Sequence, residues 1–355
     1  MKLKHILCLL AGTVLLLTGC KSISTAPDPS PAPTAAPAAV FAPLPTHTPA
    51  PTNTPAPTEI PYERPEVVLL GEKDMVVQAD FTFTDPGCLA WGENEEDLSA
   101  RVVVMGEVIP YIPGTYKLTY SVTDDKGEVG FASRTVTVKA VEPPAVVEPE
   151  GKVVYLTFDD GPCNYTERLL DVLKKYDAKA TFFVVGNKHR TDLIRRAYEE
   201  GHSIGVHTYT HVYRDIYASE EAFFKDFLAA QQVIYEQTGT YTRLFRFPGG
   251  SGNTCSRFNK GIMTRLTQYM TDMGYLYFDW NVSSGDCAEG RTREQVVSSV
   301  IGGIKRREFP VVLQHDVKRF SVAAVEDILI WGTENGYRFL PLTPDSPPLH
   351  AKLLN

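Results

Sequence analysis

From Val153 to Pro162 the sequence is VVYLTFDDGP. An apolar, β-branched run that stops on two carboxylates and a Gly-Pro turn is typical of a buried strand that leads into a functional site. Because side chains alternate along a strand, Asp159 and Asp160 should point in different directions, and they can therefore take different chemical roles. Asp and Gly-Pro are also ordinary turn formers, so this stretch alone does not exclude a solvated turn.

From Gly151 onward, apolar segments typical of strands alternate with amphipathic segments typical of helices. The expected strands are 153–158, 180–185, 203–206, 243–247, 275–280, 310–314 and 338–341. The expected helices are 166–176, 219–237, 292–305 and 322–335. This alternation indicates a parallel sheet, most simply an α/β fold in the form of a distorted, incomplete (β/α)7 barrel. Catalytic groups in such a barrel lie at the carboxyl ends of the strands.

Ionisable side chains gather at these expected strand ends. They are Asp159, Asp160, His207, His211, Arg246, Asp279, His315 and Asp316. Two histidines four residues apart lie on one side of a helical turn, a spacing that occurs in zinc sites. Two imidazoles with one carboxylate leave coordination positions open for water and substrate, so the pattern indicates a catalytic metal site rather than a structural one. His202 directly follows Gly201 and is interpreted as structural or solvated.

The N-terminus carries the features of a secretion signal. Lys2 and Lys4 precede the apolar run 6–17, which is too short for a comfortable membrane span. Residues 17–20, LTGC, resemble the bacterial lipobox, in which the cysteine is lipid-modified and becomes the mature N-terminus. An ordinary cleaved signal and an uncleaved anchor are the alternatives. We expect lipid on Cys20 to hold the protein at the extracellular face of the cytoplasmic membrane.

Composition divides the chain into five segments. They are a lipoprotein signal peptide (1–20), a Pro/Thr/Ala-rich linker (21–62), a small all-β sandwich (63–140), a second linker (141–150) and the α/β domain (151–345). The first linker lacks the large apolar residues that a core requires, whereas the sandwich shows short alternating strands between turns.

The net charge of −8 over 355 residues gives no basic footprint for nucleic acid. We expect a monomer.

Five motifs occur in order along the larger domain. They are TFDDGP (157–162), HTYTH (207–211), RFP (246–248), DW (279–280) and LQH (313–315). In this order they resemble the motifs of the polysaccharide deacetylases, the NodB-homology domain of carbohydrate esterase family four. The resemblance covers roughly residues 151 to 342. The preceding sandwich is similar to the immunoglobulin-like repeats of secreted, wall-associated bacterial proteins.

The resemblance implies a role for each motif residue. Asp160, His207 and His211 would hold a divalent metal, commonly zinc, with cobalt as an alternative. Asp159 would be the general base, oriented by Arg246. His315 would be the general acid, oriented by Asp279. The substrate pocket would be formed by Pro248, Gly249, Trp280 and Leu313. Base and acid are separate groups because their protonation states must differ at the same pH.

The third motif departs from the family pattern. Pro248 is followed by Gly249 and Gly250, where the family usually has a tyrosine after the proline. The backbone N–H of Gly249 still offers a donor to an oxyanion. The missing aromatic side chain leaves open what forms the wall of the groove and which sugars fit it.

The cysteines also carry an expectation. Outside the signal, and apart from Cys20, the chain has Cys88, Cys163, Cys255 and Cys287. Cys255 and Cys287 each follow a strand end on the same rim, so a disulfide between them would brace the mouth of the site, while free thiols are the alternative.

Together these features predict a hydrolase that removes N-acetyl groups from cell-wall polysaccharide, with peptidoglycan N-acetylglucosamine as the expected substrate. A lipid tether followed by a linker with a reach on the order of 100 Å suits a polymer close to the membrane. The alternatives are chitin-like, exopolysaccharide or O-acetylated xylan chains, an inactive wall-binding module, or an adhesin. Intact Asp159 and His315 argue against the last two, because binding alone requires neither.

Overall fold

The computed structural model describes residues 64–355. The predicted signal peptide, the lipidation site at Cys20 and the first linker lie outside these residues. Within 64–355, none of the helices combines the length and the apolar character that a membrane span requires.

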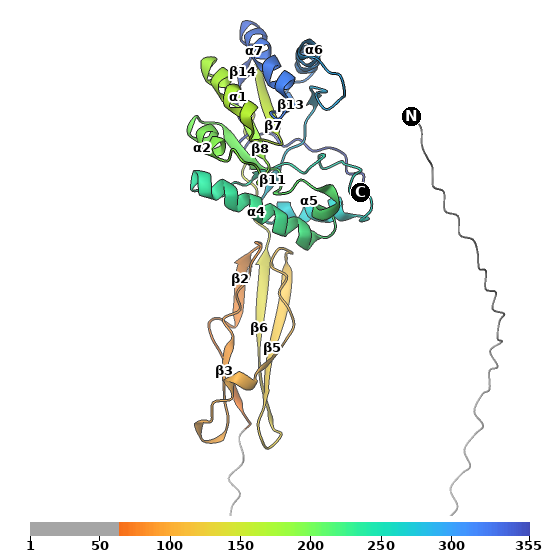
Figure 1. Ribbon diagram of the computed structural model, residues 1–355. Helices are drawn as coiled ribbons and strands as arrows, with labels where there is room; N and C mark the ends of the chain where they lie inside the picture. Colours follow the sequence, from red (N-terminus) through yellow and green to blue (C-terminus); the bar gives the residue numbers. More distant parts are fainter. Residues whose placement is uncertain (1–63) are drawn as a thin grey trace, which may run out of the picture. The chain divides into compact units, whose positions relative to one another are not determined.

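The larger domain is built on an eight-stranded sheet in the order β11-β10-β9-β8-β7-β13-β12, with β14 pairing with β7 (Figure 1). The strands are β7 (Val153–Asp159), β8 (Thr181–Val184), β9 (Ser203–Val206), β10 (Leu244–Phe245), β11 (Leu276–Tyr277), β12 (Val282–Ser283), β13 (Val311–His315) and β14 (Arg338–Phe339). Every pairing is parallel. This is the incomplete (β/α)7 barrel that the sequence predicts. The expected strand 275–280 is shorter than predicted, and β12 was not anticipated.

Helices connect the strands and cover the sheet. They are α1 (Asn164–Lys175), α2 (Asp192–Glu199), α3 (Tyr213–Ile216), α4 (Glu220–Thr238), α5 (Ile262–Asp272), α6 (Arg293–Ile304) and α7 (Arg319–Glu334). Their ends follow local sequence signals. The Ser219 side chain accepts from Ala222 N–H at the start of α4, and Gly239 closes that helix at a φ of 74°. Thr292 and Gln295 form a capping box on α6.

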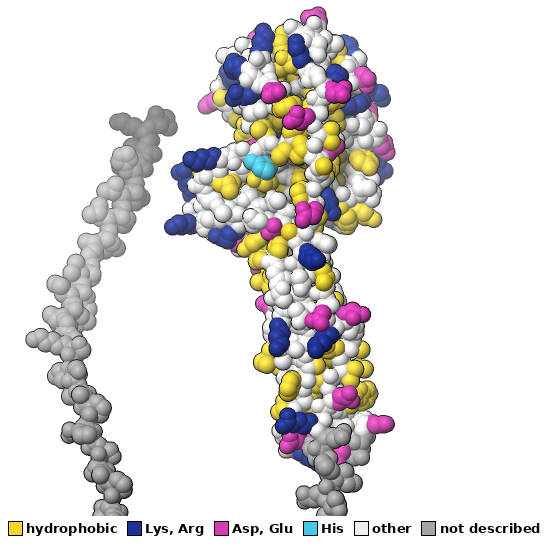
Figure 2. Space-filling view, turned by 180° about the vertical axis from the view of Figure 1, so that it is seen from behind, with side chains coloured by type: hydrophobic (Ala, Val, Ile, Leu, Met, Phe, Trp, Pro, Cys, Tyr) yellow, Lys and Arg dark blue, Asp and Glu magenta, His cyan; other side chains and the backbone are white. Residues whose placement is uncertain are grey.

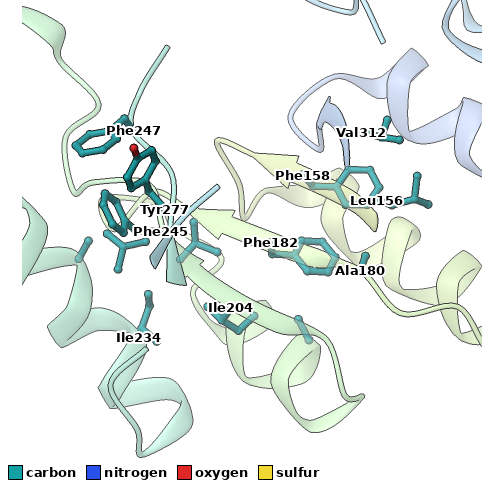
Figure 3. Packing of buried hydrophobic residues seen from close by; sticks show 14 of the residues in the cluster. Leu156, Phe158, Ala180, Phe182, Ile204, Ile234, Phe245, Phe247, Tyr277 and Val312 are labelled. Atoms are coloured by element: carbon teal, nitrogen blue, oxygen red, sulfur yellow. The ribbon is translucent and has the colours of Figure 1, made fainter. Parts of the chain in front are cut away.

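The sheet is held by an apolar core that reaches the strand ends. Every residue of β7 is buried, as expected for a central strand covered on both faces. The rings of Phe158 and Phe182 stack with centroids 5.5 Å apart, and Phe245 meets Phe247 edge-on at 4.8 Å (Figure 3). Because such a core is close-packed, it fixes the position of each strand end and therefore of the polar residues that follow it.

The smaller domain is an immunoglobulin-like sandwich. Two short strands, β1 (Glu66–Leu69) and β3 (Cys88–Trp91), pair antiparallel. The second sheet contains β2 (Asp74–Gln78), β6 (Val129–Lys139), β5 (Gly114–Thr123) and β4 (Val103–Met105) in that order. Short 3₁₀ turns at Glu93–Glu95 and Ser99–Arg101 connect β3 to β4. The β5–β6 hairpin turns at residues 124–127, a stretch whose sequence, DDKG, is typical of a turn.

Aromatic side chains pack where the sandwich meets the larger domain. The described residues 64–355 belong to one compact unit. Phe81 and Tyr111 of the sandwich place their rings 5.4 and 4.8 Å from that of Phe224 on α4. Tyr111 also lies 5.4 Å from Tyr269 on α5. This junction is therefore stabilised by apolar burial and edge-on aromatic contacts.

A buried cation holds the two sheets of the sandwich together. The Arg134 side chain is fully buried, and it pairs with Asp85 and donates to Glu72 O at 2.9 Å. Tyr120 O–H donates to the same Asp85 carboxylate at 2.7 Å. Since a buried guanidinium without a counter-ion is costly, the sandwich depends on this pair.

Asp85→Asn should therefore lower the free energy of unfolding by about 3 kcal/mol, because it leaves Arg134 buried without its counter-ion. Urea-induced unfolding followed by circular dichroism measures the change. The matched control is Asp125→Asn, which breaks the exposed Arg101–Asp125 pair and should cost less than about 1 kcal/mol. If the two substitutions lower the free energy of unfolding equally, the buried Arg134–Asp85 pair contributes no more to stability than an exposed pair does.

Candidate functional site

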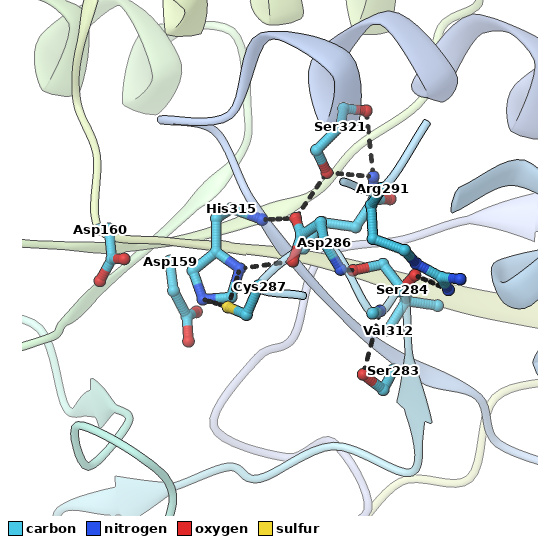
Figure 4. A network of polar contacts seen from close by, with 12 residues as sticks. Asp159, Asp160, Ser283, Ser284, Asp286, Cys287, Arg291, Val312, His315 and Ser321 are labelled. Atoms are coloured by element: carbon cyan, nitrogen blue, oxygen red, sulfur yellow. Dashed lines mark hydrogen bonds and ion pairs between the residues drawn. The ribbon is translucent and has the colours of Figure 1, made fainter. Parts of the chain in front are cut away.

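The two carboxylates at the end of β7 line the same cavity but differ in their hydrogen-bond and ion-pair partners (Figure 4). Asp159 is buried and accepts from Arg246 Nη1–H at 2.8 Å. Asp160, at a φ of 75°, turns instead toward two histidines. Its Oδ1 lies 3.3 Å from His211 Nε2 and 3.7 Å from His207 Nε2. Because Asp159 Oδ2 also lies 3.7 Å from His207 Nε2, both carboxylates reach the same histidine, and they differ in their remaining partners, Arg246 for Asp159 and His211 for Asp160.

Asp160, His207 and His211 form a donor set that fits a divalent metal. One ligand atom from each lies within 4.8 Å of the others. His207 Nδ1–H donates a hydrogen bond to Arg246 O at 2.8 Å. The other ring nitrogen, Nε2, therefore has its lone pair free on the side of Asp160. Burial lowers the pKa of His207 to about 3, so its imidazole is neutral and able to ligate. Two nitrogens and one oxygen are a ligand set that zinc accepts, with positions left open.

The backbone around this donor set is held in an uncommon conformation. Asp160, Thr208 and His211 all have positive φ angles, of 75°, 71° and 58°. Residues other than glycine rarely adopt positive φ angles. Those that do are found most often at functional sites, where the surrounding structure holds the backbone in this conformation. The Asp226 carboxylate supports the second motif by accepting from Tyr209 N–H at 2.5 Å and from Thr210 Oγ1–H at 2.6 Å.

Arg246, which directly follows β10, holds Asp159 although β9 and β8 lie between their strands in the sheet. Its guanidinium is fully buried and donates to Thr157 Oγ1 at 2.7 Å, to Phe278 O at 2.7 Å and to Asp279 O at 3.0 Å. Burial raises the pKa of Asp159, and the Arg246 charge offsets this only in part. The result is a carboxylate fixed in position and more basic than an exposed one.

The orienting residue of His315 is Asp286, not Asp279. His315 Nδ1–H donates to Asp286 Oδ1 at 2.8 Å, and His315 N–H donates to Asp286 Oδ2 at 2.8 Å. Ser321 Oγ–H donates to the same carboxylate at 2.6 Å (Figure 4). Burial by itself lowers the pKa of His315, but Asp286, Cys287 and Asp159 outweigh it and raise the pKa to about 11. His315 is therefore a protonated imidazolium at neutral pH.

Asp279 has a different position, which corrects the role implied for it by resemblance. Its carboxylate accepts from Ser251 N–H at 2.8 Å, from the Ser251 hydroxyl and from Ala351 N–H at 2.7 Å. It therefore anchors the loop after Arg246 to the C-terminal segment. The resemblance gave this role to Asp279 of the DW motif, whereas the residue that pairs with His315 is Asp286, in the loop after β12.

A cavity of about 370 Å³ joins these groups. It is lined by Asp159, Asp160, His207, His211, Tyr213, Gly249, Trp280, Ser283, Gly285, Asp286, Cys287, Leu313 and His315. Gly249, Trp280 and Leu313 line it as expected, while Pro248 is not among the lining residues and instead accepts from Tyr217 O–H through its carbonyl at 2.8 Å. Sequence reasoning missed Tyr213, which lies two residues after the second motif, and Asp286, and it placed Cys287 at the rim only as half of a disulfide.

The cysteines do not form the expected bridge. Cys88, Cys163, Cys255 and Cys287 are free thiols, which makes the predicted Cys255–Cys287 disulfide wrong for this structure. Cys287 Sγ instead lies 3.6 Å from Nδ1 and 3.7 Å from Nε2 of His315. The loop that carries Cys287 is thus folded back onto the histidine rather than toward Cys255.

Two further polar residues have structural positions. Asp316 is buried behind the first motif and accepts from Thr166 Oγ1–H at 2.5 Å. A Cβ atom at Gly161 would lie 2.0 Å from its Oδ2, so this turn requires glycine. His202 is buried and accepts from Ala180 N–H at 3.1 Å, which agrees with its structural interpretation.

Asp286→Asn should lower the pKa of the His315 imidazole by more than one unit, because the neutral amide no longer stabilises the imidazolium. Histidine NMR titration of metal-free protein, with His315→Gln for assignment, measures this pKa. Asp279→Asn is the matched control and should leave the value unchanged. A larger drop in the Asp279 variant would restore the original assignment.

Comparison with known proteins agrees with this geometry. A family model described as polysaccharide deacetylase matches residues 147–275, and one described as bacterial surface protein, Ig-like domain, matches residues 67–138. A peptidoglycan-N-acetylglucosamine deacetylase of Bacillus cereus is 31% identical over 255 residues, which cover 67% of this chain and 90% of the relative.

Solved structures agree as well. The catalytic domain of peptidoglycan N-acetylglucosamine deacetylase from Eubacterium rectale is 50% identical, with a TM-score of 0.59 over 60% of this chain and 98% of that one. The polysaccharide deacetylase Bc1974 from Bacillus cereus is 34% identical, with a TM-score of 0.51 over 56% of this chain and 97% of that one. With its barrel, its ordered motifs and these relatives, the chain belongs to the polysaccharide deacetylases, a family of hydrolases, and carries an immunoglobulin-like domain before the catalytic one.

Proposed function

We propose that the protein hydrolyses the N-acetyl groups of peptidoglycan N-acetylglucosamine in a metal-dependent reaction. The observation that carries the proposal is the arrangement of three groups around one cavity: the metal-type donor set, a carboxylate fixed by Arg246 and an imidazolium fixed by Asp286. Amide hydrolysis needs such a base and such an acid at the same time.

Asp160, His207 and His211 would hold the metal, for which zinc is the first candidate and cobalt the second. When bound, a divalent metal supplies Lewis acidity toward the acetyl carbonyl and toward water. The neutral state of His207 and the half-exposed position of Asp160 suit this role.

Asp159 is the proposed general base. Arg246 occupies its Oδ1, so Oδ2 is the atom that can accept a proton from the attacking water. Oδ2 lies 3.7 Å from His207 Nε2, which places it beside the donor set. Its raised pKa increases its strength as a base without a change of residue type.

His315 is the proposed general acid. Its imidazolium would give a proton to the departing amine nitrogen, after which Asp286 would favour its reprotonation. Among the described residues no acceptor bonds the N–H of Gly249, which is therefore available to the oxyanion. Trp280 and Leu313 would contact the acetyl methyl group.

Peptidoglycan is preferred over other acetylated polymers for two reasons. Two of the three relatives named above are described as peptidoglycan N-acetylglucosamine deacetylases. The predicted lipid tether would also keep the enzyme within reach of wall polymer. On the face seen in Figure 2, positive and negative side chains are interspersed, so charge does not favour a strongly anionic polymer there.

Acetate release from purified peptidoglycan, chitin oligomers and acetylated xylan tests this function. We expect the highest kcat/KM on peptidoglycan, loss of activity with a chelator and recovery with zinc or cobalt. Asp159→Asn should reduce kcat roughly a hundredfold or more, because the amide cannot take the proton. Faster reaction on xylan or chitin would reassign the substrate, and full activity of metal-free protein would refute the metal dependence.

We also propose that lipid on Cys20 anchors the enzyme outside the cytoplasmic membrane. Cys20→Ala should release or mislocalise the protein and lower deacetylation of the cell's own wall, while kcat on soluble wall fragments stays within twofold of wild type. Membrane fractionation and amino-sugar analysis of the wall measure these effects. Unchanged membrane association of the variant would contradict lipid anchoring.

A further inference from the structure

The glycine that departs from the family pattern faces a tyrosine from another segment. Gly249 has a φ of 77°, and a Cβ built on it would lie 3.5 Å from both Cε1 and the hydroxyl oxygen of Tyr213. Both residues line the cavity of about 370 Å³. The Tyr213 phenol thus lies at ordinary van der Waals distance from the point where a side chain at position 249 would begin, and the tightest contact of that Cβ would be Asn253 Cβ at 3.1 Å.

Tyr213 is held in place by a stack of aromatic rings. Its ring is nearly parallel to that of Tyr217, with centroids 6.3 Å apart and an angle of 13°. The Tyr217 ring in turn stacks on Phe223 at 6.2 Å and 8°, and its O–H donates to Pro248 O at 2.8 Å. This stack connects the short helix α3 to the loop that carries Gly249, so the ring of Tyr213 is preorganised.

The hydroxyl of Tyr213 is not used by the protein. Among the described residues, none forms a hydrogen bond with this hydroxyl. The side chain lines the cavity, and its oxygen is not one of the buried polar atoms that lack a partner. It is therefore a phenol open to the cavity, with one O–H to donate. An aromatic face with a polar tip beside it is the combination that amphipathic rings offer to a partly apolar, hydroxyl-rich ligand.

We propose that Tyr213 forms the wall of the sugar subsite that the side chain after Pro248 would otherwise form. The sugar ring of the substrate would lie against the Tyr213 ring, and the phenol would donate a hydrogen bond to a sugar oxygen. Tyr213 is then a positioning residue for the sugar, not for the acetyl group. This inference rests on the proposed deacetylation of a sugar polymer.

Comparison of two substrates tests the proposal. One is an N-acetylglucosamine oligomer, and the other is an aryl acetate, which carries the acetyl group without a sugar. Tyr213→Ala should raise KM for the oligomer about tenfold, the scale of a lost aromatic contact, with kcat within threefold. Tyr213→Phe should keep the ring and lose the hydrogen bond, which predicts a rise in KM of about threefold. Both variants should hydrolyse the aryl acetate at the wild-type rate within twofold.

Tyr235→Ala is the matched control, because Tyr235 stacks on Tyr241 on the outer side of α4 and does not line the cavity. It should leave both substrates unaffected. Tyr213 also lies 5.3 Å from His211, so zinc content is measured in each variant.

An unchanged KM for the oligomer, equal losses on both substrates, or loss of zinc from Tyr213→Ala would each overturn the subsite. The proposed function fails in a different way, by absence of acetate release from every sugar substrate in the wild-type enzyme, and the subsite would fall with it.

Discussion

The buried guanidinium of Arg246 connects the barrel to its chemistry. Its donors reach Thr157 and Asp159 on β7 and the carbonyls that follow β11, so it bridges separate strands of the sheet. Its own carbonyl accepts from His207, which fixes the free nitrogen of that ring. A fully buried guanidinium needs hydrogen-bond acceptors for its N–H groups. For Arg246 these acceptors are the proposed base Asp159 and the groups beside it. The geometry of base and ligands is thus a consequence of how one charge is buried.

The two ends of the proposed reaction are kept in opposite protonation states by different means. Asp159 is desolvated, which raises its pKa, yet Arg246 keeps it available as a carboxylate. His315 is also desolvated, but Asp286 reverses the effect and holds the imidazolium. The same sheet therefore places an acid and a base side by side at the ends of two neighbouring strands, where His315 pairs in register with Asp159, and environment rather than residue type decides which is which.

The sequence predicts the barrel and most of the site because both follow from strand ends. Asp159, Asp160, Arg246 and His315 all end or follow apolar runs, and parallel strands bring their carboxyl ends to one rim. That Asp286, and not Asp279, pairs with His315 could not be foreseen, because it depends on how the loop after β12 folds back onto His315. The absence of the Cys255–Cys287 bridge has the same origin in loop conformation. Tyr213 has no strand signal, and its place in the cavity depends on tertiary packing, namely the stack on Tyr217 and the approach to Gly249.

The division of labour between the adjacent carboxylates is the central claim, and metal content tests it most directly. Asp159→Asn and Asp160→Asn are dialysed against the same zinc buffer, and bound zinc is measured by mass spectrometry. The account predicts that Asp160→Asn loses zinc whereas Asp159→Asn retains about one equivalent. Zinc loss in Asp159→Asn with retention in Asp160→Asn would contradict it.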